Sequence, residues 1–248
     1  MPRLIQISDC HLCADPDARG RRGVPLRQFE AVVEAVNRER PDLVLITGDI
    51  SNDDSAASYA LAGRTLDTLD APWEWLPGNH DVLEPMAAVR PLATELTLGA
   101  WRLLLLDTHV PGKPHGELGD EALEALAGRL AADASRPVLI AMHHPPLAVG
   151  SAWLDAIGLR RAEAFWRTLA PYSRTRAILC GHIHQAYLGR QALEAGDVTV
   201  YGCPSTVDPF LPGSEGFAVD PVARPGYRVI DLDGDALTTR VERVDFSA

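Results

Sequence analysis

Short apolar runs alternate with amphipathic stretches along the first three quarters of the chain. The apolar runs predict strands at residues 4–8, 43–47, 73–77, 101–108, 138–144 and 176–180. Between several of them, apolar residues recur at helical spacing, at 26–38, 55–69, 120–131 and 159–169. Continuously apolar strands that are joined by helices indicate a sheet covered on both faces. This part of the chain is therefore predicted to have an α/β fold.

The pattern changes after residue 185. The stretches "DVTVYGCPS" and "YRVIDLDGDALTTRVERV" alternate as strands do, with a turn at Asp233, Gly234 and Asp235 and no helix between them. We expect a β-meander at this end of the chain. The Pro- and Gly-rich stretch 209–226 predicts a loop over one face of the molecule.

Composition narrows the class of protein. The 248 residues are 46% apolar, enough for one core, and we expect one domain over residues 1–248. The net charge of -11, without a basic block, speaks against nucleic acid or an anionic membrane as a partner and favours small substrates. No run approaches the roughly 18 apolar residues that span a bilayer. Four cysteines are too few for a secreted disulfide scaffold, so we expect a cytoplasmic protein.

Polar clusters follow the predicted strands of the α/β part, except the strand at 101–108. These clusters are Asp9-Cys10-His11, Gly48-Asp49, Gly78-Asn79-His80-Asp81, His143-His144-Pro145 and Gly181-His182-Ile183-His184. Ligands of α/β sheets bind beyond the carboxyl ends of the strands, so clusters far apart in sequence are expected to meet in one crevice. On an extended backbone His182 and His184 would point to the same side, and their imidazoles would converge on one point.

The clusters contain oxygen and nitrogen donors of the kind that bind Zn, Mn or Fe. The candidate ligands are Asp9, His11, Asp49, Asn79, His143, His182 and His184. Each cluster alone has a simpler explanation, since Asp-x-His is commonly a turn or a cap and Gly-Asp a turn or a helix N-cap. Six of the eight histidines nevertheless fall in these clusters, each behind a strand. A shared metal site is therefore the better interpretation.

The series D-x-H, G-D, G-N-H-D, H-H-P-P and G-H-x-H resembles the calcineurin-like metallophosphoesterase superfamily, whose motifs are all present in order. The segments "MHHPP" and "CGHIH" are most similar to bacterial class III cyclic nucleotide phosphodiesterases and the related glycerophosphodiesterases. The similarity extends over nearly the whole length. It implies a four-layer α/β/β/α sandwich, in which two mixed sheets pack face to face and helices flank them.

The same resemblance implies a site with two metal ions, each Mn, Fe or Zn, that share the carboxylate of Asp49. The other ligands would be Asp9, His11 and His184 for the first ion, and Asn79, His143 and His182 for the second. His80 would be the catalytic group that stabilises the transition state or protonates the leaving alkoxide. The alternative for His80 is that it only orients neighbouring groups. Asp81 and His144 are expected to hydrogen-bond a ligand instead.

The resemblance implies a metal-dependent enzyme that hydrolyses small phosphodiesters. The first candidate substrates are cAMP-type 3',5'-cyclic nucleotides. The alternative is a glycerophosphodiesterase or an enzyme that acts on a broad range of phosphate esters. Rivals are a nuclease, which the net charge disfavours, and an inactive scaffold, which the complete ligand set disfavours. A homodimer is compatible with the sequence.

Two further residues bear on specificity. Related phosphodiesterases commonly carry His or Gln shortly after the P-S-T element, where this chain has Asp208. A carboxylate there would repel an anionic substrate unless it pairs with a base or faces away. Asn52 is expected either to contact phosphate or to cap the helix that begins near Ser55.

Overall fold

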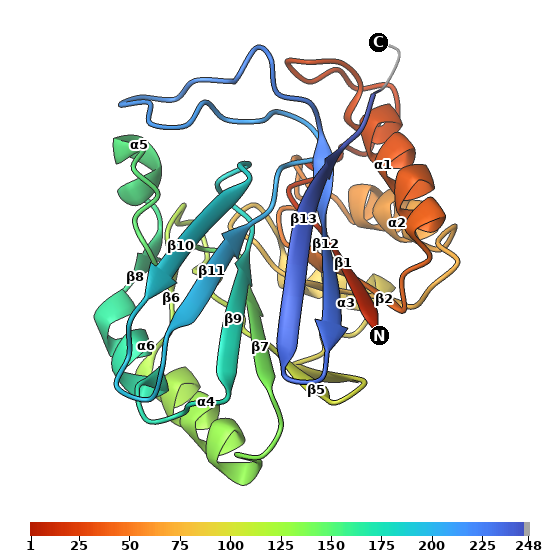
Figure 1. The fold of residues 1–248 in the computed structure, drawn as a ribbon. Coiled ribbons are helices and arrows are strands. Elements are labelled where there is room, and N and C mark those ends of the chain that lie inside the picture. Colours follow the sequence, from red (N-terminus) through yellow and green to blue (C-terminus); the bar gives the residue numbers. More distant parts are fainter. Residues whose placement is uncertain (246–248) are drawn as a thin grey trace.

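The computed structural model describes residues 1–245, and Figure 1 shows two β-sheets packed face to face with helices outside them. The first sheet has the order β13-β12-β1-β2-β3. Its strands are β1 (Arg3–Ile7), β2 (Leu43–Thr47), β3 (Trp73–Leu76), β12 (Gly226–Asp233) and β13 (Ala236–Arg243). The first three run parallel, and β12 and β13 are antiparallel additions.

The second sheet has the order β10-β11-β9-β7-β5-β4. Its strands are β4 (Glu95–Leu98), β5 (Trp101–Leu105), β7 (Val138–Met142), β9 (Thr175–Cys180), β10 (Tyr187–Gln191) and β11 (Val198–Gly202). The four inner strands are parallel, and the two edge strands are antiparallel to their neighbours. A short parallel pair, β6 (Gly116–Glu117) with β8 (Leu159–Arg160), lies outside both sheets.

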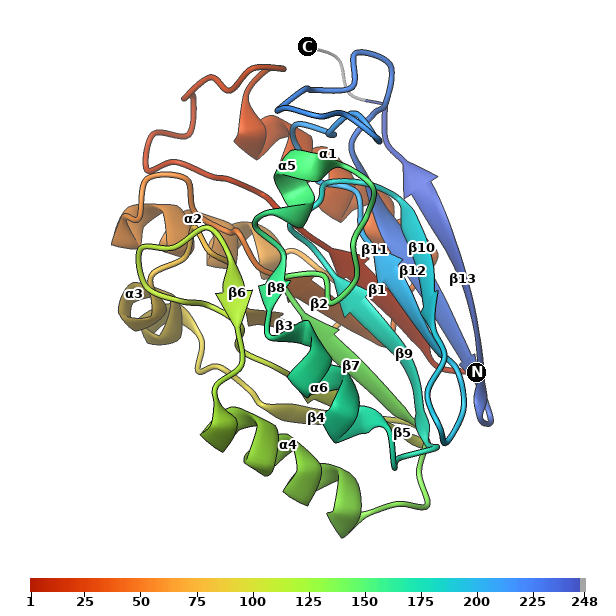
Figure 2. The same cartoon turned by 90° about the vertical axis from the view of Figure 1, so that its left-hand side faces the viewer.

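Helices cover the outer face of each sheet. The first sheet carries α1 (Pro25–Glu39), α2 (Ala56–Leu66) and α3 (Leu83–Val89), and the second carries α4 (Asp120–Ala132) and α6 (Ala162–Leu169). The short helix α5 (Ala152–Asp155) belongs to the loops after β7, and Figure 2 shows α4, α5 and α6 in front of the sheets. Two mixed sheets between helices confirm the predicted four-layer sandwich. No helix within residues 1–245 has both the length and the apolar character needed to cross a bilayer.

The strand β2 shows why the sheets are buried on both sides. All five of its residues are buried. Leu43 and Leu45 belong to the apolar layer between the sheets, whereas Val44 and Ile46 belong to the layer under α1 and α2. Because successive side chains of a strand point to opposite faces, a continuous apolar run serves two cores at once.

The predicted helices are found with small shifts at their ends. α1 begins at Pro25, a residue that fits the first turn because its missing N–H would have no partner there anyway. It ends at Glu39, and the next residue, Arg40, caps it in the left-handed conformation (φ 53°). Ser55 caps α2, with its side chain accepting a hydrogen bond of 3.1 Å from the backbone N–H of Ser58.

Two expectations are wrong. The helical pattern at 159–169 starts with strand β8, and α6 begins only at Ala162, after Arg161 turns the chain with a φ of 56°. The chain end is no single β-meander, because β10 and β11 pair in the second sheet while β12 and β13 join the first. Alternation identifies strands but carries no information on which sheet each strand joins. The loop predicted at 209–226 is found, crossing the top of the molecule in Figure 1.

Candidate metal centre

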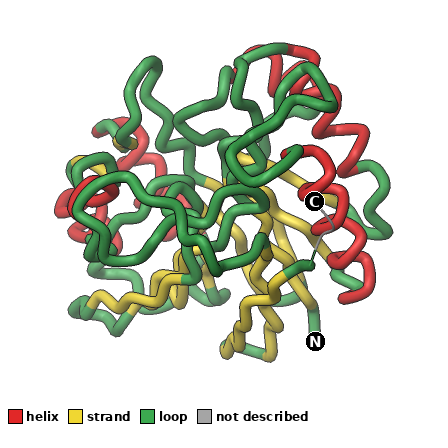
Figure 3. The backbone as a smooth tube through the Cα atoms, turned by 90° about the horizontal axis from the view of Figure 1, so that it is seen from above, coloured by secondary structure: helices red, strands yellow, loops and turns green. Residues whose placement is uncertain are grey.

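The five polar clusters lie in the loops that follow β1, β2, β3, β7 and β9. Three of these strands belong to the first sheet and two to the second, so the site spans both sheets. Figure 3, seen from above, shows loops gathered over this end of the molecule. All seven candidate side chains come together there, in two groups.

The first group is built around His184. Its Nε2 atom lies 3.4 Å from Asp9 Oδ1 and 3.3 Å from Nε2 of His11. His11 Nε2 in turn lies 3.7 Å from Oδ2 of Asp49. Three of these residues, Asp9, His11 and His184, offer ligand atoms within 4.8 Å of one another.

The second group is built around Asn79. Its side-chain oxygen lies 3.2 Å from Nε2 of His143 and 2.9 Å from Nδ1 of His182. His143 Nε2 also lies 3.4 Å from Oδ2 of Asp49. The same carboxylate oxygen of Asp49 therefore stands between the two groups, next to His11 on one side and His143 on the other.

The backbone at the donors is strained. Within residues 1–245, eight non-glycine residues have a positive φ, and five of them are candidate ligands: Asp9, His11, Asp49, His182 and His184. This conformation is costly for residues with a Cβ atom and typically persists at functional sites. It also corrects one expectation, because His182 (φ 66°) and His184 (φ 53°) are not on an extended backbone and point into different groups.

Glycines let the loops approach one another. A Cβ atom on Gly48 would lie 2.5 Å from Nδ1 of His143, and one on Gly78 would clash with the carboxylate and lie 2.5 Å from the backbone nitrogen of Asp49. The glycines in the G-D and G-N-H-D motifs are thus required by close contact between the loops after β2, β3 and β7.

Backbone carbonyls fix the tautomer of two imidazoles. Nδ1 of His143 lies 2.7 Å from the carbonyl oxygen of Thr47, and Nδ1 of His184 lies 2.7 Å from that of Asp208. A carbonyl can only accept, so each Nδ1 carries the proton and donates it. Both rings therefore turn an Nε2 lone pair towards the donor groups, as the carbonyl partners of metal-bound histidines do.

These lone pairs face other lone pairs, and this arrangement fits a cation. Nε2 of His184 faces a carboxylate oxygen of Asp9, and Nε2 of His143 faces the oxygens of Asn79 and Asp49. The second oxygen of Asp9 is buried and has no hydrogen-bond partner. Such acceptors repel one another unless a positive charge lies between them. Their oxygen and imidazole chemistry suits Zn, Mn or Fe.

Burial sets the protonation of the imidazoles. It lowers the pKa of His11 to about 4 and that of His182 to about 3, so both rings are neutral at pH 7. For His143 burial also acts to lower the pKa, but the neighbouring Asp49 carboxylate outweighs it and raises the pKa to about 9. The Asp49 carboxylate thus favours a positive charge at the point where the two groups meet.

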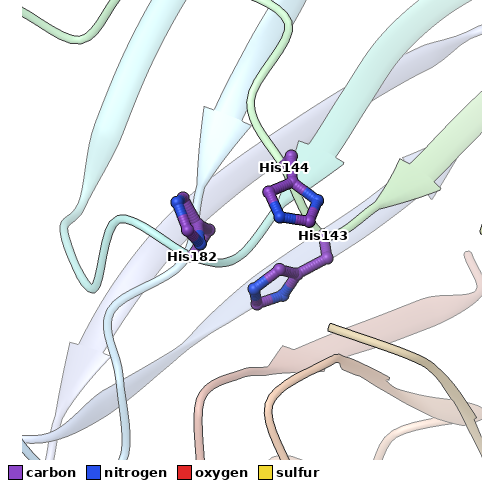
Figure 4. Close-up of side chains that lie close together, drawn as sticks. All are labelled: His143, His144 and His182. Atoms are coloured by element: carbon purple, nitrogen blue, oxygen red, sulfur yellow. The ribbon is translucent and has the colours of Figure 1, made fainter. Parts of the chain in front are cut away.

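A further imidazole, that of His144, adjoins the second group. Figure 4 shows the rings of His143, His144 and His182 close together, and their ligand atoms lie within 4.8 Å of one another. Nδ1 of His144 is 2.8 Å from Oγ1 of Thr108, and its Nε2 is buried without a hydrogen-bond partner. The His143-His144 doublet was the sequence signal for this residue, but its partner Thr108 lies 36 positions away.

The carboxylate of Asp81 does not bind a candidate ligand side chain, contrary to expectation. It accepts hydrogen bonds from the backbone N–H groups of Gly78 (2.8 Å) and Ile50 (3.0 Å) and from the hydroxyl of Tyr59 (3.2 Å). Burial raises the pKa of Asp81 to about 7. It holds together the loops that present Asp49 and Asn79.

His80 differs from the candidate ligands because its ring is exposed. Its backbone N–H donates a hydrogen bond of 2.9 Å to Oδ1 of Asp49, which positions the residue beside the shared carboxylate. The His80 and His11 rings meet edge to face, with centroids 5.0 Å apart.

Several supporting residues were not predicted. The hydroxyl of Ser205 donates to the carbonyl oxygen of Asp9 at 2.8 Å, and the backbone of Thr206 donates to that of Ser8 at 3.2 Å. The only sequence signal for them was the P-S-T element, to which both Ser205 and Thr206 belong. Cys10 and Cys13 flank His11 in C-x-x-C spacing, and both are free thiols.

Asp208 and Asn52, the two residues expected to bear on specificity, both lie at the cavity beside the donors. Asp208 pairs with Arg21, with 3.6 Å between Oδ2 and Nη1, so its charge is offset. Asn52 lines the cavity beside the donors, whereas Ser55 caps α2, which rules out the capping explanation for Asn52.

Known proteins that are similar to this chain include phosphoesterases. The family model for calcineurin-like phosphoesterases matches residues 2–186. The chain is 41% identical over 249 residues to the 3',5'-cyclic adenosine monophosphate phosphodiesterase CpdA of Pseudomonas aeruginosa, covering 98% of this chain and 90% of the relative. The protein of the same name from Escherichia coli K12 is 36% identical over 255 residues, with the same coverage.

Among solved structures, a dimetal phosphatase from Danio rerio has the same fold, with a TM-score of 0.69, 16% identity and coverage of 98% of this chain and 99% of that one. At that identity the likeness concerns the fold alone. The family match and the bacterial relatives go further, because they extend over the strands and loops that assemble the two donor groups. On this evidence the chain belongs to the calcineurin-like phosphoesterase family.

Proposed function

We propose that this phosphoesterase is a two-metal phosphodiesterase for small phosphodiesters, with 3',5'-cyclic AMP as the first candidate substrate. The observation that carries the proposal is the pair of donor groups joined through Oδ2 of Asp49. A shared carboxylate is the means by which two-metal hydrolases hold their ions close together.

In this proposal the ions are Mn, Fe or Zn. One is held by Asp9, His11, Asp49 and His184, and the other by Asp49, Asn79, His143 and His182. When bound, such a pair activates a water molecule and polarises the phosphoryl group. The chain contributes rings whose orientation is set by the carbonyls of Thr47 and Asp208 and whose burial keeps His11 and His182 neutral.

His80 is the proposed general acid. Its exposed ring lines the cavity beside the donors, and the hydrogen bond from its backbone N–H to Asp49 holds the residue next to the centre. A histidine in this place gives a proton to the departing alkoxide, a role worth on the order of 10² to 10⁴ in rate.

The relatives support cyclic AMP, since the CpdA proteins of Pseudomonas aeruginosa and Escherichia coli are named phosphodiesterases of that nucleotide. The cavity of about 230 Å³ that adjoins His11, His80 and His184 is suited to a small substrate. Glycerophosphodiesters are the second candidate substrates.

We also propose that residues 1–248 form one domain. Both sheets share a buried apolar layer, and both supply candidate ligands. Residues 246–248 lie outside the described part of the chain.

The test is a panel of cyclic AMP, cyclic GMP, glycerophosphoethanolamine, aryl mono- and diesters and single-stranded DNA, assayed after loading with Mn, Fe or Zn. We expect about two ions per chain and fastest hydrolysis of cyclic AMP. Well under one ion per chain with no hydrolysis would indicate a scaffold. Salt-sensitive cleavage of DNA would indicate a nuclease.

A further inference from the structure

The cavity beside the metal centre has walls of two kinds. His11, His80 and His184 line it on the side of the donors. The remaining walls come mainly from two loops, residues 18–23 and 207–217, which carry arginines and aromatic residues. Both loops lie at the top of the molecule in Figure 1 and Figure 2. The phosphate of a substrate belongs at the donors, so this cavity is the space for the rest of the molecule.

The two loops are fixed to each other and to the donors. Arg21 pairs with Asp208 (3.6 Å), which joins the loops, and Arg22 donates from Nη1 to the carbonyl oxygens of Asp220 (2.9 Å) and Ala223 (2.6 Å), shortly after the second loop. The ring of Phe210 stacks on the imidazole of His184, with centroids 3.8 Å apart and 8° between the planes. The spacing between the donors and the cavity walls is therefore built into the fold.

Two flat side chains remain open to the cavity. The ring of Phe217 is 51% exposed, and the guanidinium carbon of Arg21 lies over it at 4.8 Å. The Arg21 side chain is itself 66% exposed. Trp153 contacts Phe217 edge to face, with the ring centroids 5.4 Å apart. An exposed ring backed by further aromatic contacts is a surface to which planar ligands bind.

The charges favour a planar group over a phosphate at this surface. Asp208 offsets the charge of Arg21, and Arg22 uses its donors on loop carbonyls, so neither is free to clamp a phosphate. Purine and pyrimidine bases stack well on both aromatic rings and guanidinium planes. The volume, below the roughly 300 Å³ at which drug-sized sites begin, suits one nucleoside unit.

We propose that this cavity is the nucleobase subsite and that Phe217 and Arg21 are its specificity-determining residues; this rests on the proposed phosphodiesterase function. The subsite selects nucleotide diesters over glycerophosphodiesters, because only the former place a flat ring system against Phe217 and Arg21. It contributes to binding and leaves the chemical step to the residues around Asp49.

The test compares cyclic AMP with ribose 3',5'-cyclic phosphate, which has the same diester and no base. In Phe217→Ala we expect the KM for cyclic AMP to rise about tenfold with little change in kcat, because base stacking on the ring is lost. The KM for the base-free ester should stay as in the parent protein. In Arg21→Ala the KM for cyclic AMP should also rise, by a smaller factor, while the KM for the base-free ester stays unchanged. Phe217→Leu, which keeps apolar volume, covers the case in which the alanine variant folds poorly.

Leu211→Ala is the matched control, since Leu211 is exposed in the same loop and does not line the cavity. A second readout, binding of 5'-AMP to the protein by calorimetry, should weaken in Phe217→Ala and not in Leu211→Ala. If Phe217→Ala changed the KM of both esters equally, or of neither, the proposed subsite would be wrong. If the parent protein hydrolyses neither ester but binds 5'-AMP through Phe217, the proposed function fails and the subsite stands.

Discussion

The donor loops and the cavity loops are built in opposite ways. Asp9, Asp49 and His143 are almost completely buried, and the first two adopt left-handed backbone conformations. Arg21 and Phe217 are more than half exposed and belong to the two cavity loops, which are joined by the pair of Arg21 with Asp208. Buried strained loops allow one arrangement of donors, whereas exposed loops can change side chains at little cost in stability. The donor loops are therefore suited to the chemical step, and the cavity loops to substrate preference.

The largest effect is expected for Asp49→Asn, which removes the charge shared by the two donor groups at nearly constant volume. Metal content should fall, and hydrolysis should drop by on the order of 10³-fold or more, because both ions depend on that carboxylate. Elemental analysis and kcat on cyclic AMP measure the two effects. A variant that keeps two ions and full activity would show that Asp49 does not link the groups.

His80→Ala should lower kcat for cyclic AMP by about 10²- to 10³-fold while the metal content stays unchanged, because a proton donor is lost but no ligand. The loss should be much smaller for bis(4-nitrophenyl) phosphate, whose leaving group needs little protonation. The ratio of the two losses separates proton donation from positioning. Equal losses on both substrates would favour the orienting role.

Gly78→Ala should lower activity by about 10²-fold, because its Cβ would push against Asp49 and shift a donor by part of an ångström. The strain should also reduce the free energy of unfolding by about 1–3 kcal/mol. Gly128→Ala in α4 is the matched control, since its Cβ meets nothing within 4 Å. That control should raise stability by about 0.5–1 kcal/mol and leave kcat unchanged. Thermal melts measure the change in stability and steady-state kinetics measure the change in kcat. The prediction fails if the two variants behave alike.

The smallest effect is expected for Arg22→Met, which removes the bonds from the first cavity loop to Asp220 and Ala223, shortly after the second loop. KM for cyclic AMP should rise a few-fold, while metal content and kcat on a base-free ester stay near their parent values. The stability loss should be about 1 kcal/mol, the net worth of such hydrogen bonds. A fall in metal content would contradict the separation of the two regions.

The strands and helices with strong periodicity were predictable from sequence. The apolar run at 43–47 coincides with β2, and the helical pattern at 120–131 differs from α4 by one residue at the end. The edge strands β4 and β10 were missed, because their residues are largely exposed and lack an apolar run. The candidate ligands were predictable for a different reason, since their types and order repeat a known set of motifs.

The sequence by itself identified the candidate donor residues, through the order of their motifs, and the strands and helices that have strong apolar periodicity. The tertiary structure decided the rest: which sheet the last strands join, that Asp208 meets Arg21, and that Arg22 reaches Asp220 across 198 positions of the chain. These contacts arise from packing between distant segments, and no local pattern encodes which distant segment a loop will meet.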